Sequence, residues 1–263
     1  MKKWFISGAG LLLFLLSITA CQEKEEVRTG SLELVFKGTF GAEPLYMFDR
    51  TYDYLDNTRI KWQMFQFFLS DLELISDDTG LEPQMLSLVE SVSFSDIQSE
   101  SEALEGFKLR FNDIEVGNYS GIQFGLGVSP ELNATQPSDY DPSEPLAAIS
   151  SYWEAASSYI FTKIEGNADL DGDGQFGEDD EKITYHQGAN DLFEKRSLPY
   201  RIEIQENNTT SVVINVNLLK ALDNESTGEH IDFRQTPRDH HTNPEVYSFI
   251  IPQLRENAIS IGN

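Results

Sequence analysis

Apolar residues that recur at every second position are the feature that most constrains the fold of this 263-residue chain. In SVVINVNL, residues 211–218, the side chains of Val212, Ile214 and Val216 fall on one face and Val213 on the other. Successive side chains of a β-strand point to opposite faces of a sheet, so this alternation predicts a strand. The other segments that read as strands are residues 31–36, 60–75, 107–111, 120–128, 159–165 and 200–206.

The longest of these segments and the scarcity of helical stretches together indicate the fold class. Residues 60–75, IKWQMFQFFLSDLELI, are apolar on both faces, which is typical of a strand covered on both sides. Residues 201–216 place two strand-like runs around an Asn-Asn pair and predict a hairpin. Outside the N-terminus only residues 143–158 and 245–256 are helix-like. We therefore expect an all-β domain over residues 31–263, an antiparallel β-sandwich with long loops and one or two short helices.

Residues 1–20 have the pattern of a lipoprotein signal peptide. Lys2 and Lys3 precede an apolar run that is too short to cross about 30 Å of hydrocarbon. Ile18-Thr19-Ala20-Cys21 resembles the lipobox of bacterial lipoproteins, in which the cysteine is lipidated and becomes the first mature residue. Cys21 is also the only cysteine of the chain. We expect lipidation of Cys21 and a protein that is anchored to a membrane without spanning it.

The residues after Cys21 and the overall charge bear on location and partners. Residues 21–30 are charged and nearly free of apolar side chains, which indicates a tether. Glu23-Lys24-Glu25-Glu26 resembles the signal that sends lipoproteins to the outer face of the outer membrane. We expect a surface-exposed position on the outer membrane, with a periplasm-facing position as the alternative. The net charge of −25 argues against nucleic acid as a partner, because phosphate binding needs clustered Lys and Arg.

The acidic stretch NADLDGDGQFGEDDE, residues 167–181, predicts a calcium loop. Counting Asp169 as position 1, Asp171 and Asp173 stand at positions 3 and 5, and a glycine at position 6 permits the sharp turn. Gln175 at position 7 offers its backbone carbonyl, and Asp180 stands at position 12. Calcium takes six to eight oxygens at about 2.3–2.6 Å, which such a loop supplies. The flanking segments read as strands, so we expect a structural calcium site between two strands; a solvated acidic turn is the alternative.

Five motifs occur in one order along most of the chain. They are QFFLSDLELISDDTG at 66–80, GNYSGIQFGLGV at 117–128, SYWEAASSYIFTKIEG at 151–166, YHQG at 185–188 and RDHHTNPEV at 238–246. In their order and spacing the chain resembles the MbnP-like family of bacterial secreted β proteins. This resemblance implies a copper-associated protein. Members of the family bind copper through histidine and a modified tryptophan, and a di-haem redox partner oxidises that tryptophan.

The resemblance also implies which residues of this chain form the copper site. Trp153 matches the first tryptophan of the family's Trp-x-Trp, but Ala155 stands at the second, which is a departure from the pattern. His186 matches the strand histidine, and His240 or His241 the C-terminal one. Imidazole is a suitable copper ligand, so two histidines would suffice for a site. A hydrogen-bonded structural role for each histidine is the alternative.

The motifs that mark common enzymes do not occur in the sequence. It has no Gly-x-Ser-x-Gly, no His-Glu-x-x-His and no phosphate loop, so we expect a protein that is not an enzyme. The function that we expect is metal binding at the outer membrane or cell surface, with copper handling and a structural calcium loop. The alternative is a calcium-stabilised surface module that binds a protein or a glycan. A Trp153 side chain buried away from the histidines would favour that alternative.

Overall fold

Two β-sheets enclose the core of the protein. The computed structural model describes residues 1, 27–76, 81–177 and 180–262. The expected signal peptide after Met1, the lipidation site Cys21 and most of the expected tether lie outside the described residues. The last two residues of the expected tether belong to the first strand, because Thr29 and Gly30 already pair with the strand that contains Ile114 and Glu115.

The smaller sheet has the strand order β17-β13-β1-β2, and β6 also pairs with β1. Its strands are β1 (Thr29–Phe40), β2 (Glu43–Pro44), β6 (Phe107–Glu115), β13 (Thr209–Asn217) and β17 (Ile259–Ile261). The N-terminal strand β1 is an interior strand that runs parallel to β13 and antiparallel to β6. In β13, the side chains of Val212, Ile214 and Val216 are buried, as the alternation of apolar residues in the sequence predicts.

The larger sheet has the order β12-β7-β4-β10-β11-β16, and β3 and β5 pair with β4 as well. Its strands are β3 (Tyr52–Asp53), β4 (Arg59–Ile75), β5 (Gln84–Ser93), β7 (Gly117–Leu126), β10 (Thr162–Asp169), β11 (Glu181–Gln187), β12 (Glu194–Ile204) and β16 (Arg238–Asp239). The long strand β4 pairs with β10 through its first half and with β7 through its second half. It therefore holds the two halves of this sheet together.

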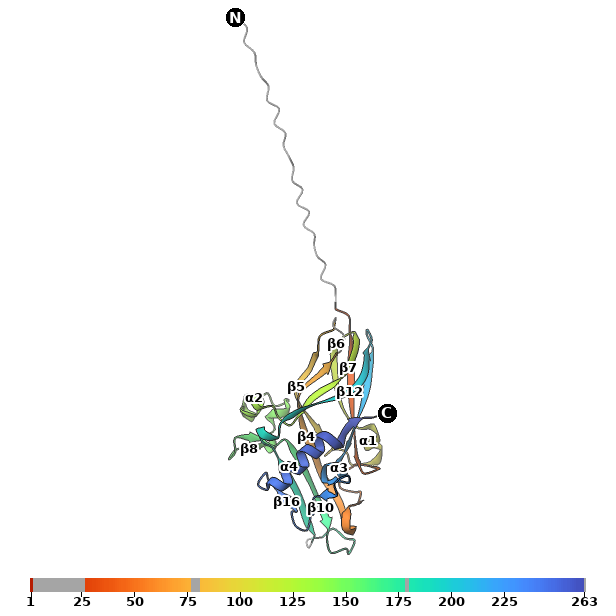
Figure 1. Ribbon diagram of the computed structural model, residues 1–263, viewed down its shortest axis with the longest axis vertical. Coiled ribbons are helices and arrows are strands. Elements are labelled where there is room, and N and C mark those ends of the chain that lie inside the picture. The colour runs from red at the N-terminus through yellow and green to blue at the C-terminus, as the bar shows by residue number, and fades with distance from the viewer. Residues whose placement is uncertain (2–26, 77–80, 178–179, 263) are drawn as a thin grey trace.

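Two small ribbons and several short helices complete the described chain. The ribbons are β8 (Tyr152–Trp153) with β9 (Ser158–Tyr159), and β14 (Asp223–Asn224) with β15 (Glu229–His230). The α-helices are α1 (Glu100–Glu105), α2 (Pro130–Asn133), α3 (Leu218–Leu222) and α4 (Pro244–Gln253). The other helical turns are η1 (Leu55–Asn57), η2 (Pro137–Asp139), η3 (Pro145–Ala147), η4 (Ile149–Ser151), η5 (Asn190–Leu192) and η6 (Leu254–Ala258). In Figure 1, α4 crosses the middle of the molecule, and α2 and β8 lie to one side of it.

One large core fills the space between the sheets. Trp62, Phe65 and Phe67 of β4 are fully buried in it together with Phe36 of β1. Each such side chain contributes about 1.5–3 kcal/mol of transfer free energy. A second, smaller cluster packs beneath the loop between β7 and β10 and contains Phe68, Val128, Leu146, Tyr159 and Phe161. This smaller cluster anchors the β8–β9 ribbon, which carries Trp153.

The all-β class that the sequence predicts is confirmed, with some differences in detail. The sheets are mainly antiparallel, but β1–β13 and β11–β16 are parallel pairs. The described residues contain four α-helices, more than the expected one or two. Residues 245–256 are helical as predicted, whereas residues 143–158 form two helical turns followed by the strands β8 and β9. This segment contains Pro145 and five serines, which favour turns over a continuous helix.

The predicted hairpin at residues 201–216 is wrong. β12 pairs with β7 in the larger sheet and β13 pairs with β1 in the smaller sheet, so the Asn-Asn turn carries the chain from one sheet to the other. Ile204 and Val212 are both buried in the large core. Because β12 and β13 lie in different sheets, their apolar faces cover the core from opposite sides. In a hairpin within one sheet, both apolar faces would cover the core from the same side. A local sequence pattern does not distinguish these two arrangements.

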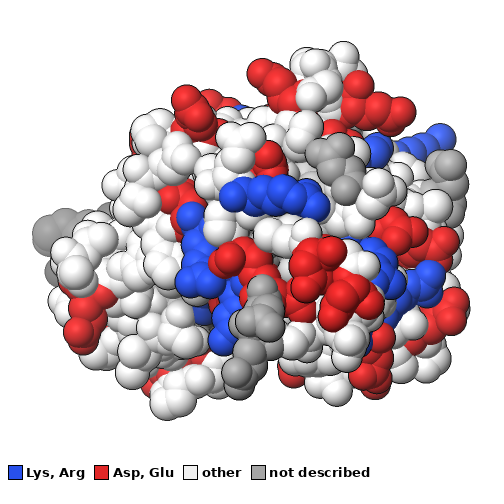
Figure 2. Space-filling model, turned by 90° about the horizontal axis from the view of Figure 1, so that it is seen from below, with Lys and Arg blue, Asp and Glu red and all other residues white. Residues whose placement is uncertain are grey.

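No helix within the described ranges is long and apolar enough to cross a membrane. On the face of the molecule shown in Figure 2, Lys and Arg side chains lie among Asp and Glu side chains.

Candidate metal centres

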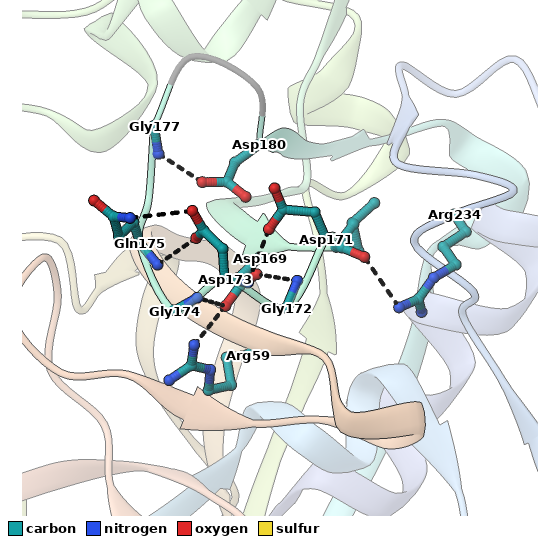
Figure 3. Close-up of polar contacts among 11 residues, drawn as sticks. Arg59, Asp169, Asp171, Gly172, Asp173, Gly174, Gln175, Gly177, Asp180 and Arg234 are labelled. Carbon is teal, nitrogen blue, oxygen red and sulfur yellow. Dashed lines mark hydrogen bonds and ion pairs between the residues drawn. The ribbon is translucent and has the colours of Figure 1, made fainter.

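The acidic loop of residues 169–180 connects β10 to β11 at the end of an antiparallel pair. Asp169, the last residue of β10, is 1% exposed. Its carboxylate accepts hydrogen bonds from the backbone N–H groups of Gly172 (2.7 Å) and Gly174 (3.0 Å), as Figure 3 shows. Both glycines have positive φ, 78° and 84°, a region that other residues rarely adopt. The loop therefore folds around the Asp169 carboxylate.

Three of the predicted calcium ligands converge in this loop. One carboxylate oxygen from each of Asp169, Asp171 and Asp173 lies within 4.8 Å of the other two. Two oxygens that bind one calcium ion at about 2.4 Å are at most about 4.8 Å apart, and the three oxygens meet this requirement for sharing an ion. Asp171 and Asp173 are exposed. The loop thus presents one buried and two open carboxylates to the same point.

Gln175 and Asp180 lie in the same loop but make other contacts. The Gln175 side-chain amide donates to Asp173 Oδ2 at 3.1 Å, and its backbone N–H donates to Asp173 Oδ1 at 2.7 Å. Asp180 Oδ2 accepts from the backbone N–H of Gly177 at 2.5 Å. These contacts hold Gln175 and Asp180 within the loop, outside the group of three converging carboxylates.

Arg59 is a member of this site that the sequence did not reveal. It lies on β4 directly opposite Asp169, and its guanidinium donates to Asp169 Oδ2 at 2.6 Å. A Cβ atom at Gly174 would approach the same guanidinium to 2.6 Å, so the glycine leaves room for it. Burial acts to raise the pKa of Asp169, but the hydrogen bonds from Arg59, Gly172 and Gly174 outweigh it and hold the pKa below its usual value. Arg59 supplies one positive charge to the buried side of the loop.

The four candidate copper residues lie together at a second place. Trp153, His240 and His241 line an open cleft of about 890 Å³, formed by the β8–β9 ribbon and by the segments that follow β11 and β16. His186 of β11 stacks on His240, with ring centroids 5.0 Å apart and an angle of 20° between the rings. The Trp153 and His241 ring centroids are 6.5 Å apart. The structure therefore brings together residues from the β8–β9 ribbon, from β11 and from the segment before α4.

Asp239 holds the two C-terminal histidines in place. This residue of β16 is 3% exposed, and its carboxylate accepts hydrogen bonds from the Gln187 side chain, from the backbone and hydroxyl of Thr242, and from the backbone of Asn243. All four of these hydrogen bonds are 2.9 Å long. The turn that they close places His241 at a φ of 55°. Backbone strain at this histidine is balanced by the bonds to Asp239.

His241 has an unused ring nitrogen. Its ring stacks on Tyr247 of α4 with centroids 4.1 Å apart, and its Nδ1 is buried without a hydrogen-bond partner among the described residues. Burial lowers the pKa of His241, although Asp191 and Asp239 oppose this shift. The lowered pKa favours the neutral ring, which is the form that binds a metal ion.

His186 is held by a carboxylate. Its Nε2 lies 2.7 Å from Oε1 of Glu165 on the neighbouring strand β10. Burial lowers the pKa of His186, while the hydrogen bond to Glu165 acts in the opposite direction. Lys163, which faces His186 across the two strands, is itself buried, and this burial lowers the pKa of its ammonium group.

The histidines are neighbours, but they are not arranged around a common point. Within the described part of the chain, the three aspartates are the one group in which at least three His, Cys, Asp or Glu ligand atoms lie within 4.8 Å of one another. The lone pair of an imidazole lies in the plane of the ring, so stacked rings direct their lone pairs along parallel planes. A change in the orientation of at least one ring is therefore required before two histidines can bind the same ion.

These features define a class of protein: a two-sheet β-sandwich with an acidic loop between β10 and β11 and, beyond the ends of β11 and β16, a cleft lined with histidine and tryptophan. The profile of the MbnP family matches residues 29–242, which is most of the chain, and the protein belongs to that family. Among solved structures, MbnP from Methylosinus trichosporium matches 90% of this chain and 99% of its own length with a TM-score of 0.52 and 12% sequence identity. This similarity concerns the fold. A search of curated proteins found no match.

Proposed function

We propose that this member of the MbnP family binds copper in the cleft lined by Trp153, His240 and His241, next to His186. The observation that carries the proposal is the position of these four residues. They come from three separate segments of the chain, and all of them lie at or beside one cleft. The Trp153 ring lies 6.5 Å from the His241 ring and is not buried away from the histidines. This position supports copper binding over the surface-module alternative.

The residues present suit a copper ion. His241 offers an unpartnered Nδ1, and burial lowers the pKa of His186 and of His241, which favours their neutral form. Neutral imidazole nitrogen is a preferred ligand of copper. His240 is exposed and is free to turn towards an ion from its stacked position. The bound ion would supply redox or transfer chemistry, and the protein residues would hold it at the wall of an open cleft.

Ala155 marks the difference between this chain and the family's Trp-x-Trp pattern. Ala155 is exposed and lines the cleft, so the place of the second tryptophan is left open. We expect Trp153 to be the residue on which a di-haem redox partner would act, since it is partly exposed at the wall of the cleft. Mass spectrometry of the native protein would test this point, because oxidation of Trp153 changes the mass of the peptide that contains it.

Calorimetric titration of calcium-loaded protein with Cu(I) and with Cu(II) tests copper binding. We expect one ion per chain and a loss of affinity of at least tenfold in each of the His240→Ala and His241→Ala variants. His230→Ala is the matched control, because His230 is exposed on β15 and lines a different hollow. Binding of the wild type no tighter than micromolar, or equal losses in all three variants, would contradict the proposal.

We propose further that the loop of residues 169–180 binds calcium as a structural ion. Three converging carboxylates and the strands on both sides support this role. Asp169 Oδ1 and the exposed carboxylates of Asp171 and Asp173 would face the ion, with Gln175 and Asp180 completing the shell after small shifts. Arg59 would remain paired with Asp169 Oδ2. An ion here would fix the β10–β11 connection and so support His186, which lies on β11.

The proposed location is the outer membrane, with a lipid anchor at Cys21. The support is the sequence of the N-terminus, in which a lipobox-like motif precedes the only cysteine. Cys21→Ala should release the protein from the membrane fraction, and protease treatment of whole cells should degrade the wild-type protein. Resistance to protease in intact cells would indicate the periplasm-facing position.

The size of the cleft favours one alternative function, a calcium-stabilised module that binds a glycan or a protein. About 890 Å³ is far more than a single ion needs, and the small side chains of Ala134, Ala156 and Ala189 line much of the cleft. Ile149 beside them is 74% exposed. Binding of a glycan or peptide by copper-free protein, abolished by Ala156→Trp, would support this alternative.

A further inference from the structure

We infer that Glu165 is the positioning residue of the proposed copper site, and that it makes Nδ1 of His186 the only nitrogen of that ring able to bind an ion. This inference rests on the proposed function, because it assigns a role to a neighbour of a proposed ligand. It concerns a residue that lies outside the candidate set derived from the sequence.

The sheet register brings Glu165 and His186 together. In the β10–β11 pair, His186 lies opposite Lys163, and Glu165 lies opposite Thr184. Glu165 is thus two residues along from the direct partner of His186 and on the same face of the sheet. Long side chains reach such diagonal neighbours, and the Glu165 Oε1 to His186 Nε2 distance is 2.7 Å.

The chemistry of the pair fixes the tautomer of the ring. A carboxylate only accepts hydrogen bonds, so the Nε2 of His186 must carry the proton that is shared with Glu165. A neutral imidazole has one N–H and one lone pair, and the lone pair therefore lies on Nδ1. Carboxylates that hold ligand histidines in this way commonly set both the tautomer and the plane of the ring.

The two stacked histidines consequently have different roles. His186 is partly buried and fixed by Glu165, whereas His240 is exposed and has no side-chain hydrogen bond within the described ranges. Since parallel rings cannot direct their lone pairs to one ion, one ring has to turn. The ring that turns is that of His240, and His186 with its Nδ1 is the stationary ligand.

Long-range ¹H–¹⁵N correlation spectra of histidine-labelled protein test the assignment before any metal is added. The wild type should show His186 as the Nε2–H tautomer. Glu165→Ala should give a mixture of tautomers, and so should Glu165→Gln, because its amide can accept from an Nε2–H or donate to an unprotonated Nε2. Glu154→Ala is the matched control, because Glu154 is an exposed acid that lines the same cleft.

Titration with Cu(I), which is diamagnetic, then extends the same spectra. We expect the His186 Nδ1 signal to shift in the wild type, and we expect Glu165→Ala to weaken copper binding by about 10–100-fold. An Nδ1–H tautomer in the wild type, or an unchanged tautomer and affinity in Glu165→Ala, would overturn the inference. Failure of the proposed function has a different signature: the wild type would show the expected tautomer and yet bind no copper.

Discussion

Removal of calcium is the perturbation that most directly tests the acidic loop. Three carboxylate oxygens lie within 4.8 Å of one another, and two of the three residues are exposed. The guanidinium of Arg59 offsets one of these charges at the buried end of the loop. If calcium neutralises the other two, a chelator should destabilise the folded protein.

The expected size of the effect follows from ligand linkage. An ion present at about 100 times its dissociation constant stabilises the folded state by about 2.7 kcal/mol. For a domain of about 150–250 residues, each kcal/mol corresponds to about 2–4 °C in Tm. We therefore expect a chelator to lower the Tm by about 5–11 °C.

The assay is thermal unfolding followed by circular dichroism with calcium and with a chelator. A double variant, Asp171→Asn and Asp173→Asn, separates ion binding from loop geometry. The oxygens of both side chains accept local backbone hydrogen bonds, from the N–H groups of Asp173 and Gln175, and an asparagine oxygen keeps these bonds. The double variant should melt at the same temperature in both buffers, and the exposed Asp141→Asn should behave as the wild type.

A wild-type melting curve that does not respond to the chelator would refute the reasoning. In that case the Arg59 guanidinium is the cation of the loop. Arg59→Ala would then destabilise the protein equally with and without calcium.

Three further predictions concern the cleft. Asp239→Ala should lower the free energy of unfolding by about 3 kcal/mol in urea titrations, since it leaves buried hydrogen-bond donors without an acceptor; an unchanged midpoint would contradict the role of Asp239. His186 and His241 have pKa values that are lowered chiefly by burial, so both side chains bind protons more readily in the unfolded state than in the folded state. The free energy of unfolding should therefore decrease as the pH drops from about 6.5 towards the lowered pKa values. Replacing both by glutamine should flatten this part of the profile. In protein prepared without residues 1–20, and therefore without Trp4, Cu(II) should quench Trp153 fluorescence, and in Trp153→Phe the remaining emission of the buried Trp62 should respond much less.

At the acidic loop, the sequence predicted which side chains lie close together, because these residues are near one another in the chain. The spacing of Asp169, Asp171 and Asp173 follows from local geometry, because alternate residues and a glycine turn the carboxylates towards one point. The strands were predictable for the same reason, since a period of two depends only on the local pattern. Arg59 was not predictable, because only the register between β4 and β10 places it opposite Asp169.

The cleft shows a similar limit. The family resemblance indicated Trp153, His186, His240 and His241 as candidate copper residues, and in the structure they lie at or beside one cleft. Glu165 was missed because its contact with His186 depends on strand pairing. The sequence carries only a general signal for Asp239: aspartate side chains often accept hydrogen bonds from backbone N–H groups that follow them in a turn.

The parallel pairing of β1 with β13 has a consequence for how the chain reaches its native state. Ser31 is aligned with Thr209, so the first strand of the domain cannot complete its sheet until almost the whole chain has been made. Contacts between such distant segments carry a large loop-closure entropy and slow folding. The apolar side chains of β1 therefore stay exposed for as long as β13 is missing, and exposed apolar strands of this kind promote aggregation during folding.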